Sequence, residues 1–350
     1  MVFIISEKKQ KKFYILTAVL CLCAILGGIL FYSFFSGYSA VSNSIGAMGT
    51  VISVKVFGNS DSRHFTALYQ IFDQVEQASS LTIPNSALSL LNTTGSTQDE
   101  ILLAQAKICR EVYDASGGAF DCTVCPVSSL WGIGTDQARV PEPDEISKAL
   151  CSVNGAELQI NEETLWIGKN QKADCGAVGK GYACDAALAY LKGTDIPGAV
   201  IAVGGSILLY GKSSPAGAGF TVAVRDPFGT QTDFAGILKL QEGFISTSGD
   251  YERFFMQNGV RYHHILDPKT GFPAQSGLTS VTVITKDSGT LSDALSTACF
   301  VLGLEKGFQL LQDFNAEGIF ITQEGTVYVT DGLCETFTLT AAHLKMGELS

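Results

Sequence analysis

The pair Asp293 and Thr297 lies in the sequence SDALST, near the start of a helix expected from Leu291 to Gly303. Residues four apart project from the same face of a helix, so their side-chain oxygens lie close together. Mg²⁺ usually takes one or two protein carboxylates and completes its shell with water and phosphate oxygens. The pair therefore suits a magnesium site. Taken alone, the pattern favours a simpler interpretation, in which Asp293 stabilises the helix N-terminus and Thr297 has a satisfied hydroxyl.

Two of the four histidines of the chain, His263 and His264, occur in the strand-like sequence RYHHIL, just before the turn DPKTG. Adjacent residues of a strand face opposite sides, so only one imidazole can point into a given cleft. Such a histidine could act as a general base, with Asp267 of the turn orienting it. The motif alone favours the alternative, a structural or surface histidine.

The segment DCGAVGKGYACD, from Asp174 to Asp185, is a glycine-rich turn between the strand-like TLWIG and a helix. Backbone amides and a helix N-terminus at such a turn favour phosphate binding. Its spacing excludes a Walker loop and a dinucleotide fingerprint, and a plain strand-to-helix turn explains the segment equally well. A second candidate phosphate contact is STSGDYERFF, in which small polar residues precede Arg253; the alternative there is a tight turn with an ion pair.

Eight cysteines lie outside residues 13–35, and two of them form the motif Cys122-x-x-Cys125. An even number of cysteines in an oxidising compartment permits disulfides, and a C-x-x-C motif occurs in redox and zinc sites. No second C-x-x-C completes a zinc set. Several of the other cysteines occur in apolar stretches, where a thiol behaves as a small hydrophobic group. We therefore expect mainly buried free thiols.

The N-terminal region indicates a membrane anchor. Residues 13–35 are 23 consecutive uncharged, mostly apolar positions, which is long enough to cross a hydrocarbon core of about 30 Å. Four lysines precede this run in a basic tail of residues 1–12, and no charge follows it until Lys55. We therefore expect a cytoplasmic tail, a single N-terminal span in the cell membrane and an extracytoplasmic domain. A cleaved signal peptide and a lipidated cysteine are the less favoured alternatives.

The rest of the chain predicts one α+β domain over residues 45–345, after a polar linker at 36–44. A hydrophobic content of 46% is ample for a packed core, and a formal net charge of −11 argues against nucleic acid as a partner. The sequence predicts a strand across GAMGTVISVKVFG, a helix capped by Asp61, a helix from Gln98 to Ala115 and strands from Gly198 onward. The segment GGAFDCTVCPVSSLWGIG has no clear period and is expected to be a long ordered loop.

Seven segments between residues 46 and 303 closely resemble, in this order, those of the ApbE-like FAD:protein FMN transferases. They are GAMGT, GGAFDCTVCPVSSLWGIG, DCGAVGKGYACD, VGGSILLYGK, STSGDYERFF, YHHILDPKTGFP and SDALSTACFVLG. The resemblance implies a single mixed α/β domain of this type that binds FAD and Mg²⁺. It also implies transfer of the FMN half of FAD to a threonine or serine hydroxyl of a partner flavoprotein, with release of AMP.

The resemblance assigns roles to individual residues. His264 matches the histidine that the family uses in catalysis, whereas His263 is expected to face away. Some members have an aspartate at the position of Ser296, so water is expected to take the place of that ligand here. The metal ligands implied are the backbone carbonyl of Ala177 and the side chains of Asp293 and Thr297. The contacts implied with FAD come from Met48, Ala119, Phe120, Asp121, Asp174, Lys180 and Leu266.

Two other functions remain open at this stage. With water as the acceptor, the same site would be an FAD pyrophosphatase that gives FMN and AMP. Without turnover, the chain would be a membrane-tethered FAD-binding protein. For the transferase, the expected partner is an FMN-accepting flavoprotein that is exported or is a membrane redox subunit, because the catalytic domain is expected outside the cytoplasm.

Overall fold

The computed structural model describes residues 40–58, 61–214, 217 and 219–348. The basic tail predicted at residues 1–12 and the span predicted at 13–35 lie outside the described residues. In the part of the chain that is described, none of the helices combines the length and the apolar character needed to cross a membrane.

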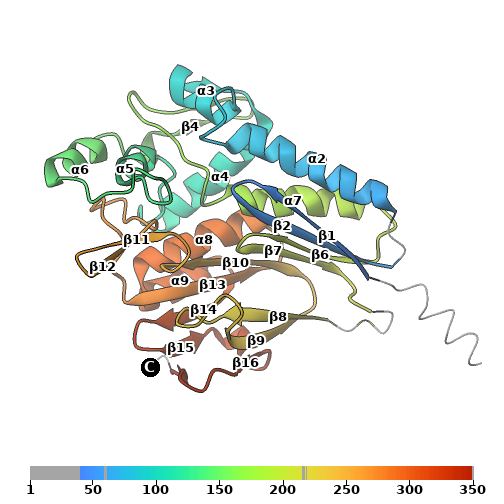
Figure 1. The fold of residues 1–350 in the computed structure, drawn as a ribbon. Helices are drawn as coiled ribbons and strands as arrows, with labels where there is room; N and C mark the ends of the chain where they lie inside the picture. Colours follow the sequence, from blue (N-terminus) through green and yellow to red (C-terminus); the bar gives the residue numbers. More distant parts are fainter. Residues whose placement is uncertain (1–39, 59–60, 215–216, 218, 349–350) are drawn as a thin grey trace, which may run out of the picture.

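Helices and strands alternate irregularly along the chain (Figure 1). The helices are α2 (Ser62–Ser79), α3 (Ala87–Thr94), α4 (Glu100–Ala115), α5 (Cys125–Trp131), α6 (Pro143–Leu150), α7 (Gly179–Lys192), α8 (Gly289–Leu302) and α9 (Leu304–Asp313), with 3₁₀ turns η1 (Gly155–Glu157) and η2 (Asp331–Leu333). The strands are β1 (Ala40–Ala47), β2 (Thr50–Phe57), β3 (Ser96–Thr97), β4 (Gln159–Ile160), β5 (Leu165–Trp166), β6 (Gly198–Val203), β7 (Ser206–Gly211), β8 (Phe220–Arg225), β9 (Phe234–Leu240), β10 (Gly243–Gly249), β11 (Phe254–Gln257), β12 (Val260–His263), β13 (Leu278–Thr285), β14 (Glu317–Thr322), β15 (Thr326–Val329), β16 (Phe337–Leu339) and β17 (Lys345–Met346).

A nine-stranded sheet in the order β1-β2-β6-β7-β10-β13-β14-β15-β17 forms the centre of the domain. All neighbouring strands in it are antiparallel except β15 and β17. Figure 1 shows the helices above this sheet and the small sheet β16-β9-β8 below it. Separate hydrophobic clusters fill the two interfaces. The domain thus has three layers, and the predicted α+β class is confirmed.

Two turns of the large sheet lie at the same end of its strands, together with the end of β10. The turn Met48–Gly49 joins β1 to β2, and the turn Gly204–Gly205 joins β6 to β7. Because β2 pairs with β6 and β7 pairs with β10 in antiparallel register, both turns lie at the same end as Gly249, where β10 stops. Met48 and Gly49 have φ angles of 53° and 64°, values that a two-residue hairpin turn of type I′ requires and that a side chain such as methionine rarely adopts.

Three local predictions need correction. Residues 40–44, assigned to the linker, belong to β1, because β1 pairs with β2 along its whole length from Ala40. The segment expected to be a long loop contains α5, which Pro126 can start because a proline in the first helical turn loses no hydrogen bond. The strand expected across GAMGTVISVKVFG is interrupted by the hairpin turn Met48–Gly49.

The cysteines support the prediction of free thiols. Within the described residues all eight are free, and only Cys151 and Cys334 are exposed. Loss of hydration raises the pKa of the Cys125 thiol to about 11, and the nearby carboxylate of Asp174 adds to this effect. A thiol with that pKa is almost entirely protonated at neutral pH and is therefore a poor nucleophile and metal ligand. The motif Cys122-x-x-Cys125 is part of the packed interior.

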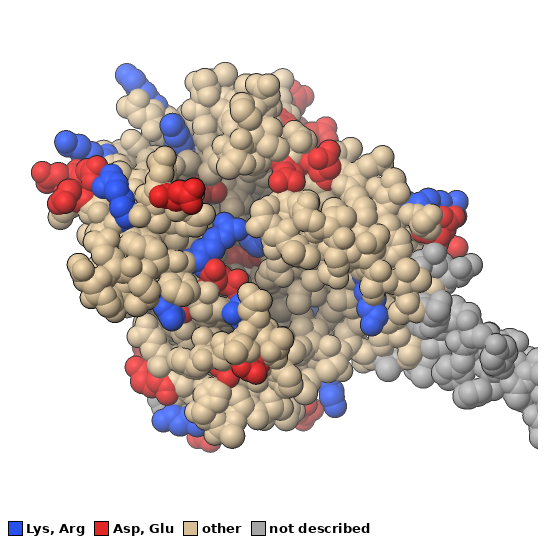
Figure 2. Space-filling view, viewed as in Figure 1, with Lys and Arg blue, Asp and Glu red and all other residues tan. Residues whose placement is uncertain are grey.

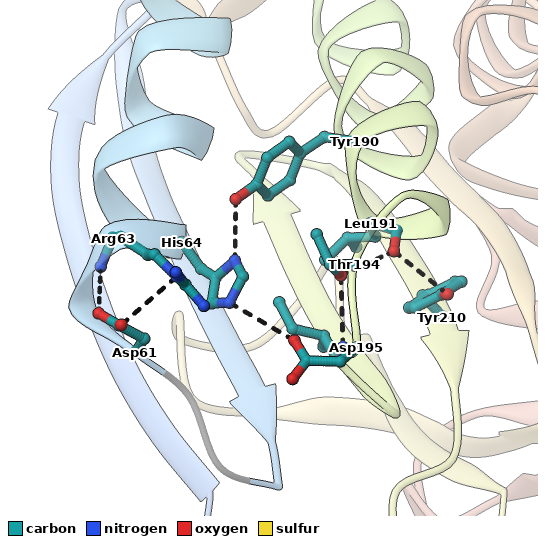
Figure 3. Close-up of polar contacts among 9 residues, drawn as sticks. Asp61, Arg63, His64, Tyr190, Leu191, Thr194, Asp195 and Tyr210 are labelled. Atoms are coloured by element: carbon teal, nitrogen blue, oxygen red, sulfur yellow. Dashed lines mark hydrogen bonds and ion pairs between the residues drawn. The ribbon is translucent and has the colours of Figure 1, made fainter.

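A buried histidine joins α2 to the end of α7 that lies far from the Met48–Gly49 turn. His64 Nδ1 lies 2.8 Å from the hydroxyl of Tyr190, and Nε2 lies 3.9 Å from a carboxylate oxygen of the exposed Asp195 (Figure 3). The predicted cap of α2 is also present, since Asp61 Oδ1 accepts a hydrogen bond from Arg63 N at 3.0 Å. These contacts fix the helices that cover one half of the sheet.

Candidate functional site

Asp293 is a buried carboxylate at the crossing of α7 and α8. Its Oδ2 accepts a hydrogen bond from the backbone nitrogen of Gly181 at 2.7 Å, and its Oδ1 accepts one from Ser206 Oγ at 2.5 Å. A carboxylate offers about four acceptor positions. The protein uses two of them, so Asp293 can still bind a cation.

The close approach of α7 to α8 depends on two glycines. A Cβ atom added to Gly181 would lie 2.0 Å from the backbone oxygen of Gly289, and one added to Gly289 would lie 2.5 Å from the oxygen of Gly181. Asp185, one turn further along α7, accepts hydrogen bonds from the backbone nitrogens of Gly289 and Thr290 at 2.6 and 2.9 Å. It thereby caps the start of α8 from a different helix, and this fixes Asp293 against the first turn of α7.

The carbonyl of Ala177 is open just before α7. Gly181 lies in the first turn of α7, and the nitrogens of that turn have no acceptor within the helix. The Gly181 nitrogen donates to Asp293, and no backbone donor reaches the Ala177 oxygen within the described residues. A bound carboxylate and an open carbonyl therefore occur at the start of α7, and both are oxygen ligands of the kind that hard cations prefer.

Thr297 lies one turn after Asp293 on α8. Its hydroxyl is 3.3 Å from Ser248 Oγ of β10, and the neighbouring Ser296 hydroxyl is 2.8 Å from the same atom. Ser296 Oγ also donates to the backbone oxygen of Asp293 at 2.9 Å. Ser296 is therefore committed to the protein, and Thr297 has the freer hydroxyl. The described part of the chain contains no cluster of three or more histidine, cysteine or acidic side chains that could hold a metal.

His264 follows β12 directly, and the two adjacent histidines face opposite sides as predicted. His263 is buried, with Nε2 3.1 Å from the backbone oxygen of Ala274 and its ring against Phe300. His264 is exposed, and its Nδ1 lies 3.2 Å from the backbone oxygen of Arg253. Because a carbonyl only accepts hydrogen bonds, Nδ1 carries the proton in this arrangement and Nε2 presents a free lone pair.

The prediction that Asp267 orients the histidine was wrong. Asp267 Oδ1 accepts a hydrogen bond from Lys269 N at 2.9 Å and so stabilises its own turn. The backbone of Arg253 orients His264 instead, through Nδ1 and through a hydrogen bond from the His264 nitrogen at 3.1 Å. A carbonyl partner cannot be seen in a sequence, because every residue carries one.

Two cations surround the imidazole. The guanidinium of Arg253 lies beside the Met48–Gly49 turn, since a Cβ on Gly49 would be 3.8 Å from its Nη2. Lys180, in the first turn of α7, donates from Nζ to the oxygen of Gly176 at 3.1 Å. His264 is exposed as a residue, but its ring is set among protein atoms. This loss of hydration, followed by the charges of Arg253 and Lys180, lowers the pKa of His264 to about 4.

These contacts unite the predicted metal and catalytic residues at one place. Lys180 and Gly181 are adjacent in α7, Gly181 is bonded to Asp293, and Lys180 acts electrostatically on His264. Figure 2 shows Lys and Arg side chains next to acidic ones at a hollow in the middle of one face. At neutral pH the imidazole is neutral, so Nε2 can accept a proton, and the positive charges around it suit an anionic substrate.

The residues expected to contact FAD differ in their surroundings. Asp174 Oδ1 accepts a hydrogen bond from Gly176 N at 2.8 Å, and the side chain is partly exposed. Asp121 is buried, and its two oxygens bind Thr123 and Gly155 at 2.7–2.8 Å, so its carboxylate stabilises the loop. The side chains of three others belong to the hydrophobic interior: Ala119, Phe120 and Leu266. Their contact with FAD stays a prediction.

Sequence reasoning did not predict the contacts by which Ser206, Ser248 and Asp185 hold the site together. Ser206 binds Asp293, Ser248 binds the Ser296 and Thr297 hydroxyls, and Asp185 caps α8. Both serines lie in motifs that the resemblance had marked, VGGS and STSG. Asp293, the partner of Ser206, is 87 positions away in the sequence, and the partners of Ser248 are at least 48 positions away. Only the fold therefore shows which side chains meet.

Comparison with known proteins gives the family. The sequence model of the ApbE family matches residues 48–320. The chain is 33% identical over 312 residues to "FAD:protein FMN transferase" of Treponema pallidum, covering 82% of this chain and 86% of that protein. It is 32% identical over 304 residues to a protein of the same name from Klebsiella pneumoniae, covering 84% and 91% of the two chains.

Solved structures agree with the sequence relatives. The crystal structure of the ApbE protein of Thermotoga maritima superposes with a TM-score of 0.76 at 29% identity, covering 84% of this chain and 98% of that one. The flavin transferase ApbE of Vibrio cholerae also gives a TM-score of 0.76, at 27% identity, covering 85% and 99%. The fold, the extent of the sequence match and the identity with full-length relatives lead to one conclusion: the chain belongs to the ApbE family of FAD:protein FMN transferases.

Proposed function

We propose that this flavin transferase moves the FMN half of FAD to a threonine or serine hydroxyl of an acceptor flavoprotein in a Mg²⁺-dependent reaction. The observation that carries the proposal is the placement of His264, with a free Nε2, near the first turn of α7, whose Gly181 nitrogen is bound by Asp293. Transfer from a pyrophosphate needs a group that accepts the proton of the attacking hydroxyl. It also needs a phosphate-binding site, such as a helix N-terminus, and oxygen ligands for a metal ion.

The proposed metal ligands are the Asp293 carboxylate, the Thr297 hydroxyl and the Ala177 carbonyl. Two acceptor positions of Asp293 and the Ala177 oxygen are free of protein donors among the described residues. One carboxylate is enough for Mg²⁺, which keeps several waters and binds substrate phosphates. When bound, the cation would neutralise charge on the pyrophosphate and favour departure of AMP.

The protein's own groups would then perform the transfer. Lys180 and the N-terminus of α7 attract the pyrophosphate, because both present positive charge at the start of the helix. His264 accepts the proton of the acceptor hydroxyl at Nε2. The hydroxyl oxygen forms a bond to the phosphorus on the FMN side, the phosphorus–oxygen bond to AMP breaks, and AMP leaves with the electron pair.

The test uses the purified chain, FAD, Mg²⁺ and an FMN-accepting domain of an ion-translocating oxidoreductase. AMP release and flavin fluorescence of the denatured acceptor are measured together. The proposal predicts equal amounts of AMP and covalently bound flavin. Release of AMP and free FMN without labelling would indicate the pyrophosphatase instead. Bound FAD without AMP release would indicate a non-catalytic flavin-binding protein.

We further propose that the protein is held at the cell membrane by residues 13–35 with its catalytic domain outside the cytoplasm. The support is the uncharged run of 23 residues behind a lysine-rich tail. The acceptors would then be exported or membrane-bound redox proteins. Protease treatment of intact cells and of cells with an opened envelope tests this orientation: digestion of the domain only after disruption of the inner membrane would contradict it.

A further inference from the structure

Three serines of the central sheet face α8. Ser206 of β7 pairs directly with Ser246 of β10, and Ser248 follows two positions later on β10. Directly paired residues of neighbouring strands lie on the same face of a sheet, and so do residues two apart in one strand. The three side chains therefore project from one face, over which α8 lies (Figure 1). Each hydroxyl meets a side chain of α8.

Ser206 holds the carboxylate of Asp293. Ser206 is 1% exposed, and its Oγ lies 2.5 Å from Asp293 Oδ1. Because a carboxylate accepts hydrogen bonds, Ser206 donates its single proton to Asp293. Among the described residues its Oγ makes no other hydrogen bond. The backbone nitrogen of Gly181 binds the second carboxylate oxygen, so the carboxylate is fixed in one orientation.

The hydroxyls around Ser248 form a chain with a fixed direction. Ser296 Oγ lies 2.9 Å from the backbone oxygen of Asp293, and because a carbonyl only accepts hydrogen bonds, Ser296 uses its proton there. Ser248 Oγ lies 2.8 Å from Ser296 Oγ and must be the donor of that pair. Since Ser248 has no second proton, Thr297 is the donor in the 3.3 Å contact between Thr297 Oγ1 and Ser248 Oγ.

This direction leaves the lone pairs of Thr297 Oγ1 free. A threonine hydroxyl has one proton and two acceptor positions. The proton is directed at Ser248, and no donor reaches Thr297 Oγ1 in the part of the chain that the structure describes. A cation binds oxygen lone pairs, whereas a hydroxyl proton repels it. Ser248 therefore holds Thr297 in the orientation that a metal ligand requires.

Ser246 has the same surroundings but no metal ligand as its partner. Its Oγ lies 2.8 Å from Ser292 Oγ, and Ser292 donates its own proton to the backbone oxygen of Gly289 at 2.9 Å. Ser246 is fully buried and lies on the same face of the sheet as Ser206 and Ser248. It thus binds α8 to the sheet in the same way, through a hydroxyl, without touching Asp293 or Thr297.

We propose that Ser206 and Ser248 are positioning residues of the metal site. Ser206 fixes the carboxylate of Asp293, and Ser248 directs the lone pairs of Thr297 away from the sheet and toward the cation. The inference rests on the proposed function, because it takes Asp293 and Thr297 as metal ligands. It adds the residues that set the affinity for the metal, since hydrogen bonds to metal ligands typically change that affinity about 10- to 100-fold.

The experiment measures Mn²⁺ binding to the full-length chain in complex with FAD, without an acceptor. Free Mn²⁺ is counted from its electron paramagnetic resonance signal during a titration. We expect Ser206→Ala and Ser248→Ala to raise Kd for Mn²⁺ about 10- to 100-fold. Ser246→Ala, the matched control, and Ser248→Thr, which keeps a hydroxyl, should bind Mn²⁺ like the wild type. The Mg²⁺ concentration for half-maximal AMP release should rise in parallel, whereas kcat at saturating Mg²⁺ should recover.

Wild-type Mn²⁺ affinity in either Ser206→Ala or Ser248→Ala would overturn the role of that serine. Ser248 is only partly buried, so its variant should fold even where Ser206→Ala does not, and thermal unfolding checks this. An equal loss of affinity in Ser246→Ala would also overturn the inference, because the packing of α8 alone would then control the site. These results leave the proposed function intact as long as Asp293→Ala abolishes Mn²⁺ binding. A wild type that binds Mn²⁺ no better than Asp293→Ala would count against the proposed metal site itself.

Discussion

The carboxylate of Asp293 in α8 binds the backbone nitrogen of Gly181 in α7 at 2.7 Å. The bond gives an acceptor to a free amide in the first turn of α7 and so holds the two helices together. Asp293 thus has a structural role in the protein alone and a proposed metal-binding role in the complex with FAD.

Replacing Asp293 separates these two roles. Asp293→Ala should abolish transfer at every Mg²⁺ concentration and lower the free energy of unfolding by about 1–3 kcal/mol, because Gly181 N and Ser206 Oγ lose their acceptor. Asp293→Asn keeps one acceptor oxygen and should recover part of the stability without the activity. Denaturant unfolding and Mg²⁺ titration of AMP release measure the two effects. Undiminished, metal-dependent turnover in either variant would contradict the ligand assignment.

Gly181→Ala tests the contact between α7 and α8. The new Cβ would meet the Gly289 oxygen at 2.0 Å, so the helices must move apart, at a cost of about 1–3 kcal/mol or more. Loss of both stability and FAD binding is expected. Gly193→Ala at the other end of α7 is the control, because its Cβ would meet nothing closer than 3.5 Å. Equal behaviour of the two variants in thermal unfolding would refute the close-contact argument.

His264→Ala removes the proposed base and leaves the rest of the site in place. FAD affinity should stay close to that of the wild type, whereas transfer should fall about 10²- to 10⁴-fold. Fluorescence titration with FAD and single-turnover AMP release separate binding from chemistry. Much weaker FAD binding with little change in the transfer rate would assign His264 to substrate binding instead.

The pKa of His264 should depend on Arg253. In the free protein it is lowered to about 4, first by loss of hydration and then by the charge of Arg253. Arg253→Ala removes a cation that disfavours the imidazolium, so the pKa should rise toward the ordinary value of about 6.5. NMR titration of the ring proton measures it, with Arg63→Ala as the distant control. A pKa that falls or stays constant in Arg253→Ala would contradict the electrostatic account.

His64 should matter for stability alone. His64→Leu removes the 2.8 Å hydrogen bond to Tyr190 and leaves that hydroxyl without its partner, which should cost about 1–3 kcal/mol of unfolding free energy. Transfer by the folded variant should equal that of the wild type, because His64 lies at the opposite end of α7 from Lys180. Chemical denaturation and the transfer assay measure both. A change in kcat at unaltered stability would show a coupling between the two ends of α7.

The sequence was most informative where a local pattern alone decides the structure. Asp61 caps α2 because a short acidic side chain reaches the first free amides of the following helix, and this requires no distant partner. The alternation of His263 and His264 follows from strand geometry in the same way. The glycines of the segment DCGAVGKGYACD were visible in the sequence, but the reason for them was not. Gly181, in the first turn of α7, is required by its contact with Gly289, more than one hundred residues later.

The site itself required the fold. Asp293 alone looked like an ordinary residue at the start of a helix, and its significance comes from Gly181 and Ser206 on other elements. The family resemblance identified Asp293 because the segments that proteins of one family share include those that meet at a common site in the fold. The partner of His264 was predicted wrongly for the same reason: the carbonyl of Arg253 reaches the ring through the pairing of β11 with β12, which a sequence motif does not show.

The most direct test of the proposed centre is a crystal structure with FAD and Mn²⁺ in place of Mg²⁺, with the metal located from its anomalous scattering. The account predicts one peak about 2.1 Å from a carboxylate oxygen of Asp293, the Thr297 hydroxyl and the Ala177 carbonyl, in contact with the pyrophosphate of FAD. His264 Nε2 should face the phosphorus on the FMN side. A peak remote from Asp293, or a pyrophosphate bound away from the start of α7, would contradict it.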